Sequence, residues 1–141
     1  MNKEKVIVAL NEILEFELAG VVRYTHYALM IFGHNRIPIV KWLRDQATES
    51  LMHANQAGEC ITMLDGHPSL KISNLLETHK HSINDILQES LEHEKVQAEN
   101  YKKLLKLVEG HSIMLEEYAR TMIFDEETHI SEVEKMIRKP G

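Results

Sequence analysis

The chain has 141 residues, 43% hydrophobic and 27% charged, which fits one globular domain over residues 1–141 and excludes a disordered chain. The formal net charge of −6 argues against a nucleic-acid partner. The single cysteine, Cys60, excludes an internal disulfide, and no apolar run reaches the ~18 residues that cross a membrane. Because charged residues break the opening stretch too early for a signal peptide, we expect a soluble cytoplasmic protein.

Glycine and proline divide the chain into segments with helical periodicity. The first predicted helix spans about residues 3–32 and stops before Gly33. The second spans about 38–65, with Pro38 suited to a first helical turn. In both segments apolar residues recur at three- and four-residue steps, which is the pattern of a helix with one buried face.

The third and fourth predicted helices span about 78–109 and 112–138, on either side of Gly110, with Ser112 as the candidate N-cap of the fourth. The first and third connections are short, so each joins antiparallel neighbours, whereas the second is long enough to run along the bundle. The sequence therefore predicts an all-α four-helix bundle made of two antiparallel hairpins joined by a long crossover.

Ionisable residues interrupt the apolar face of every predicted helix. A lone buried carboxylate is costly, and four at similar heights would repel one another strongly. Singly, each residue is best explained as a paired or edge-exposed polar group. Together they favour a pair of divalent cations, because carboxylate and imidazole ligands suit iron or manganese. The candidate metal ligands are Glu17, Glu49, His53, Glu94, Glu126 and His129.

The two halves of the chain also match each other at a separation of 77 residues. Two similar hairpins packed about a pseudo-twofold axis would bring two equivalent half-sites face to face, as a two-metal site requires. The matched pairs are Leu10 and Leu87, Leu14 and Leu91, Glu17 and Glu94, Tyr24 and Tyr101, Gly33 and Gly110, His34 and His111, and Glu49 and Glu126.

The stretches 10–18, 64–70 and 125–130 resemble bacterioferritin, and the Glu126–His129 pair matches the Glu-x-x-His motif of the ferritin-like di-iron family. The resemblance covers nearly all four helices. It implies a ferritin-like fold, two iron ions per chain with manganese as an alternative, and oxidation of ferrous iron by oxygen or peroxide for storage or detoxification. It also implies a homo-oligomer, at least a dimer.

In that family the two histidines each hold one ion, and the carboxylates divide between terminal and bridging ligands. By resemblance Glu17 and Glu94 would be terminal. Glu49 and Glu126 would bridge the two ions, with His53 and His129 completing the set.

The second helix departs from the family motif because one extra residue separates its carboxylate from its histidine. If His53 fixes the alignment, Ser50 takes the carboxylate position; if the internal repeat fixes it, Glu49 does. We expect both Glu49 and His53 to bind, through a changed rotamer or a single π-bulge.

Two further departures bear on haem and on assembly. Leu51 occupies the position of the family's haem methionine, and Met52 beside it suits packing or the surface, so haem is not expected. No counterpart of the family's short fifth helix follows Lys139, which leaves a full storage shell open.

Tyr24 and Tyr101 each lie two helical turns after a candidate ligand. They either pack in the core, or hydrogen-bond a metal carboxylate and supply electrons; the family resemblance favours this second role for Tyr24. His79, His81 and His93 could bind surface metal, but we expect them to be solvated. The alternative functions are a di-iron or di-manganese redox enzyme for peroxide or an organic substrate, and a metal-free helical binding module.

Overall fold

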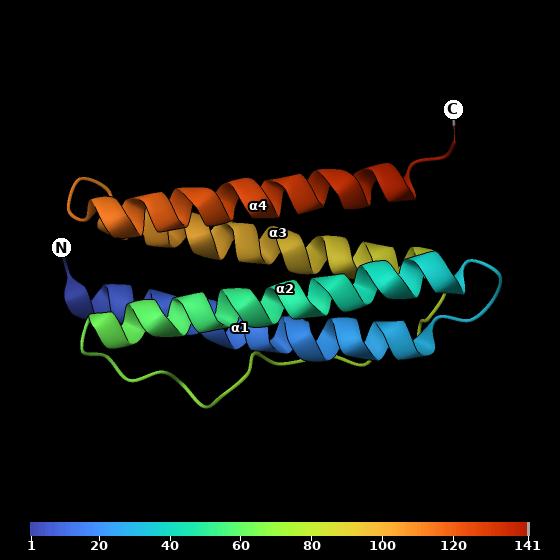
Figure 1. The fold of residues 1–141 in the computed structure, drawn as a ribbon, viewed down its shortest axis with the longest axis horizontal. Coiled ribbons are helices and arrows are strands. Elements are labelled where there is room, and N and C mark those ends of the chain that lie inside the picture. Colours follow the sequence, from blue (N-terminus) through green and yellow to red (C-terminus); the bar gives the residue numbers. More distant parts are fainter. Residues whose placement is uncertain (141) are drawn as a thin grey trace.

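A computed structural model describes residues 1–140 and contains four long helices, α1 (Lys3–Met30), α2 (Arg36–Met63), α3 (Ile83–Val108) and α4 (Ile113–Ile137). α1 and α2 form one hairpin, α3 and α4 form the other, and a long segment runs along the outside of the bundle from α2 to α3 (Figure 1). The predicted all-α four-helix bundle with two hairpins and a long crossover is confirmed. None of the four helices is both long enough and apolar enough to cross a membrane.

The helix ends follow from local capping. Ser112 accepts a hydrogen bond from the Leu115 backbone N–H, which confirms the predicted N-cap of α4. α3 begins five residues later than predicted, because Ser82 caps it through the Asp85 N–H. The crossover is correspondingly longer than the sequence suggested.

Gly33 and Gly110 occupy equivalent places in the two hairpin turns, and both have left-handed backbone (φ 102° and 78°). A side chain would strain the backbone at these angles, so glycine is required for each hairpin to reverse. The internal repeat therefore extends to the turns.

α1 and α3 bury the same positions at a separation of 77 residues. In each helix the buried series combines aliphatic residues with one carboxylate and, two turns later, one tyrosine. Their exposed fractions agree closely within pairs, as expected of two halves related by a pseudo-twofold axis. The pairs are Leu10 and Leu87, Leu14 and Leu91, Glu17 and Glu94, and Tyr24 and Tyr101.

α2 and α4 instead match at a separation of 76 residues. The first hairpin thus carries one extra residue before the middle of the bundle. Ser50, which is buried, is therefore the structural equivalent of Glu126, and Glu49 lies beside that position. The inward-facing pairs are Leu43 and Ala119, Gln46 and Met122, Ser50 and Glu126, His53 and His129, and Ala57 and Val133.

Candidate metal centre

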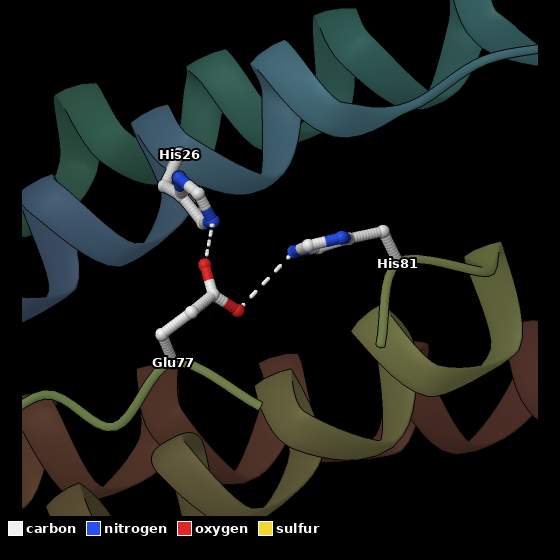
Figure 2. A group of neighbouring side chains, drawn as sticks. All are labelled: His26, Glu77 and His81. Atoms are coloured by element: carbon white, nitrogen blue, oxygen red, sulfur yellow. Dashed lines mark ion pairs between the residues drawn. The ribbon is translucent and has the colours of Figure 1, made fainter. Parts of the chain in front are cut away.

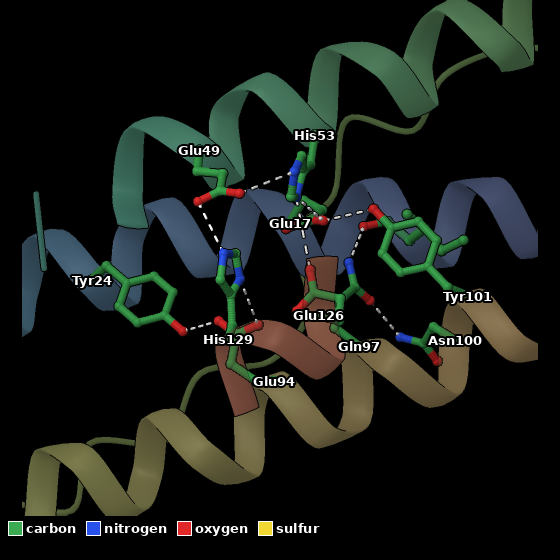
Figure 3. Close-up of polar contacts among 11 residues, drawn as sticks. Glu17, Tyr24, Glu49, His53, Glu94, Gln97, Asn100, Tyr101, Glu126 and His129 are labelled. Atoms are coloured by element: carbon green, nitrogen blue, oxygen red, sulfur yellow. Dashed lines mark hydrogen bonds and ion pairs between the residues drawn. The ribbon is translucent and has the colours of Figure 1, made fainter. Parts of the chain in front are cut away.

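All six predicted ligands meet halfway along the bundle, with every helix contributing (Figure 3). The carboxylates of Glu17, Glu94 and Glu126 are almost completely buried, at 2%, 5% and 2% exposure, and His53 is 3% exposed. The structure therefore places ionisable groups at the centre of an otherwise apolar core, where an unbalanced charge is most costly.

The buried ligands form two overlapping groups. Glu17, His53 and Glu126 form the first group, and Glu94, Glu126 and His129 form the second; within each, one potential ligand atom per residue lies within 4.8 Å of the others. Glu126 belongs to both groups. Two three-residue groups that share one carboxylate are the arrangement expected of adjacent cation positions with a common ligand.

Glu49 reaches the same cluster from its flank. α2 is α-helical throughout, so the expected π-bulge is absent. Glu49 nevertheless points inward: Oε2 lies 3.2 Å from His129 Nε2, and Oε1 lies 3.6 Å from His53 Nε2. Its side chain is 31% exposed, because its backbone position is one residue away from the inward-facing Ser50.

The structure adds Asp125, which the sequence pattern did not single out. Asp125, Glu49 and His53 form a further group of close ligand atoms on the more open side of the centre. Asp125 precedes Glu126 and lies off the apolar face of α4, so helical periodicity gave no signal for it. Only its proximity in sequence to the motif could have drawn attention to it.

His93 was expected to be solvated, and this prediction is wrong. It is 6% exposed and stacks against Phe16, with ring centroids 4.2 Å apart and planes inclined by 13°. Burial lowers the pKa of His93 to about 4, so the ring is neutral. It lies on the inner face of α3 beside Glu94, where the 3.6-residue period still directs it into the bundle.

Gly20 allows α1, α2 and α3 to approach closely beside the centre. A Cβ atom at this position would lie 2.9 Å from Ser50 Oγ and 3.0 Å from His93 Nε2. The absent side chain thus makes room for Ser50, in the position where the fourth helix has Glu126.

The two tyrosines bind site carboxylates on the opposite hairpin. Tyr101 Oη on α3 donates a 2.7 Å hydrogen bond to Glu17 Oε2 on α1, and Tyr24 Oη on α1 donates to Glu94 Oε1 on α3. Burial raises the pKa of both phenols well above the usual value, so both remain protonated donors. Of the two interpretations offered by the sequence, the hydrogen bond to a carboxylate is the one observed.

The charges in the cluster show what it lacks. Burial and the neighbouring Glu94 carboxylate raise the pKa of Glu126 well above its usual range, and Glu126 Oε2 has no hydrogen-bond partner. Burial would also lower the pKa of His129, but hydrogen bonds to Glu49 and Glu94 raise it to about 10. Protons thus neutralise carboxylates that divalent cations would neutralise more directly, and the oxygen and nitrogen donors fit such cations.

The sequence of residues 7–140 matches the ferritin-like domain family. The chain therefore belongs to the ferritin-like family, as its resemblance to bacterioferritin suggested. No curated protein matches it significantly.

Solved structures show the same fold. A ferritin-like di-iron-carboxylate protein from Bacillus anthracis is 21% identical, with a TM-score of 0.90 over 96% of this chain and 97% of that one. A dodecameric thioferritin, the bacterioferritin-related protein of Bacteroides fragilis, is 19% identical, with a TM-score of 0.86 over 96% and 85% of the two chains. Rhodobacter capsulatus bacterioferritin, solved with a metal-free dinuclear site and haem iron, is 26% identical, with a TM-score of 0.82 over 95% and 84%.

Proposed function

We propose that this protein binds two ferrous ions per chain between its four helices and oxidises them with oxygen or peroxide. One observation carries the proposal: Glu126 is shared by two buried ligand groups drawn from both hairpins. A metal-free helical scaffold gives no reason to bury three carboxylates together, since each carries a desolvation cost. The match to the ferritin-like family supports this proposal.

Glu17 with His53, and Glu94 with His129, would hold one ion each, and Glu126 would contact both. Such a pair of iron ions supplies electrons together to an oxidant. The tyrosines then act through the carboxylates: Tyr101 orients Glu17 and Tyr24 orients Glu94. Holding ligand oxygens in place limits the reorganisation needed when an ion arrives.

Glu49 is the candidate ligand that solvent reaches most easily. Its contacts with both histidines suit a carboxylate that meets an incoming ion and then spans the two positions, as its predicted bridging role requires. Asp125 lies on the same side and adds negative charge there. Tyr24, buried against Glu94, is the candidate catalytic residue that would supply an electron during oxidation.

The rest of the proposal concerns the metal and the assembly. Iron is the proposed metal and manganese the alternative. The closed arrangement of Glu17, Glu94 and Glu126 favours handling of the ion itself over turnover of an organic substrate, which would need space beside the metals. A homo-oligomer, at least a dimer, is proposed because the structurally similar B. fragilis thioferritin is dodecameric.

Anaerobic titration with ferrous iron tests binding, and aerobic mixing followed by the absorbance of ferric iron tests oxidation. We expect about two ions per chain, the number that two ligand groups sharing one carboxylate can hold, and oxidation well above the protein-free rate. Glu94→Ala should lose both, whereas Glu99→Ala, which removes an exposed glutamate of the same helix, should lose neither.

The outcomes separate the alternatives. Two bound ions without accelerated oxidation would leave a binding protein and sink the proposed activity. No bound iron after loading would support a metal-free module. Rapid oxidation by peroxide of an added organic reductant, with no net turnover of iron, would favour the redox enzyme.

A further inference from the structure

A second group of potential metal ligands lies outside the centre, where the crossover passes between α1 and the start of α3 (Figure 2). It consists of His26 near the end of α1, Glu77 in the crossover and His81 just before α3. Three elements that are distant in sequence thus bring two imidazoles and one carboxylate together.

Both imidazoles direct Nε2 at the same carboxylate. His26 Nε2 lies 2.8 Å from Glu77 Oε2, and His81 Nε2 lies 3.3 Å from Glu77 Oε1. Both Nε2 atoms are buried from solvent, yet neither meets hydrogen-bond geometry. In a tetrahedral shell with ligand bonds of about 2.0–2.1 Å, ligand atoms lie about 3.3 Å apart, close to the separations here.

The carboxylate is held in place by its own loop. Glu77 Oε1 accepts a 2.7 Å hydrogen bond from the His79 backbone N–H, and His79 has left-handed backbone (φ 57°), which turns the chain back on itself. Thr78 Oγ1 donates a 2.9 Å hydrogen bond to Glu89 on α3, which fixes the loop to the bundle. These contacts place the group in advance of any ligand.

The surroundings favour a cation. The three residues line a cavity of about 200 Å³ together with Arg23 and Glu89. The charges of Arg23 and Glu89 cancel, so Glu77 leaves one net negative charge when both imidazoles are neutral. A surface ion pair between one histidine and one glutamate would contribute little to stability and would not explain why two imidazoles converge.

We propose that His26, Glu77 and His81 form a binding site for a single divalent first-row transition metal ion, separate from the centre between the helices. Two imidazole nitrogens and a carboxylate oxygen suit Zn²⁺ or Fe²⁺ and leave a further position for water. A bound ion would tie the crossover to α1 and α3.

Calorimetric titration with Zn²⁺ tests the site in a chain whose central site is disabled by Glu94→Ala and Glu126→Gln. We expect one ion per chain, and at least tenfold weaker binding when His81→Ala is added. His79→Asn is the matched control, because it removes an exposed imidazole of the same loop and asparagine tolerates the left-handed backbone. Absence of binding to the disabled chain, or equal affinity after His81→Ala, would overturn the proposal, and neither result bears on the central site.

Limited proteolysis of the unaltered chain provides a second readout. Lys80 lies between the proposed ligands, and Lys71 lies earlier in the same crossover. If trypsin cleaves after local opening, Zn²⁺ at 100 times its Kd should slow cleavage after Lys80 about 100-fold, with cleavage after Lys71 as the internal reference. His81→Ala should abolish this protection; equal protection at both lysines would contradict a site at His26, Glu77 and His81.

Discussion

Tyr101 Oη on α3 lies 2.7 Å from Glu17 Oε2 on α1, and Tyr24 on α1 makes the reciprocal hydrogen bond to Glu94 on α3. Each hairpin therefore orients the carboxylate that the other contributes. The central site and the packing of the two hairpins are consequently linked through the same two bonds.

Tyr101→Phe should weaken ferrous iron binding about 10–100-fold, because it frees the carboxylate of Glu17 from its donor. The metal-free protein should lose about 1.5–3 kcal/mol of stability, as is usual for a hydrogen bond to a charged group. Iron titration and urea unfolding measure the two effects. Tyr27→Phe is the control, since its hydroxyl bonds Arg23 and no site carboxylate; equal iron affinity in Tyr101→Phe and Tyr27→Phe would refute the role of Tyr101.

Glu126→Gln should stabilise the metal-free protein by about 1–3 kcal/mol while removing the ligand common to both groups. Burial raises the pKa of Glu126, so the folded state holds a proton that the unfolded state releases above about pH 4.3. The contribution of Glu126 to stability therefore falls as pH rises from there towards the folded pKa.

Urea unfolding of chelator-treated protein at pH 5 and pH 7 measures this effect. The variant should gain more over the parent at pH 7 than at pH 5, and iron titration should show the loss of binding. A variant less stable than the parent at both pH values would indicate that Glu126 is balanced by the protein alone.

Glu49→Gln should reduce the iron affinity of at least one position, because the amide keeps the shape but loses the charge that faces both histidines. Asp45→Asn, one turn earlier on α2 and paired with Lys41 at the surface, is the matched control and should bind as the parent does. Iron titration of both variants decides the matter. Indistinguishable isotherms would remove Glu49 from the ligand set.

Gly20→Ala should cost about 1–3 kcal/mol of folding stability, because the new methyl group meets Ser50 Oγ and His93 Nε2. In a Ser50→Ala background the cost should fall by about 1 kcal/mol, which a double-mutant cycle of urea unfolding would measure. Gly58→Ala, on a helix with nothing within 4 Å of the added Cβ, should instead gain about 0.5–1 kcal/mol. Additive effects of the Gly20 and Ser50 changes would show that the two residues do not crowd each other.

The four helices and the inward carboxylates could be predicted from the sequence because a buried helical face recurs with a strict period, and ionisable residues stand out on it. The start of α3 could not, since the cap at Ser82 competes with other polar residues in the crossover. The burial of His93 was missed because a histidine beside a charged residue looks solvated. The pairing of His26 with Glu77 and His81 depends on tertiary structure, which brings a loop against a helix 50 residues earlier in the chain.

The register of α2 was harder still. Both alignments of its motif were open in the sequence, and only the buried positions show that Ser50, not Glu49, matches Glu126. The side chain of Glu49 is long enough to cover the difference, which no periodicity argument could have decided.

The extra residue in the first hairpin makes the two sides of the centre chemically unequal. On one side a carboxylate and a histidine sit a single helical turn apart on α4; on the other a serine occupies the carboxylate's place, and a longer reach from the flank replaces it. We therefore expect two ions to load in sequence rather than as an equivalent pair, the more enclosed side first.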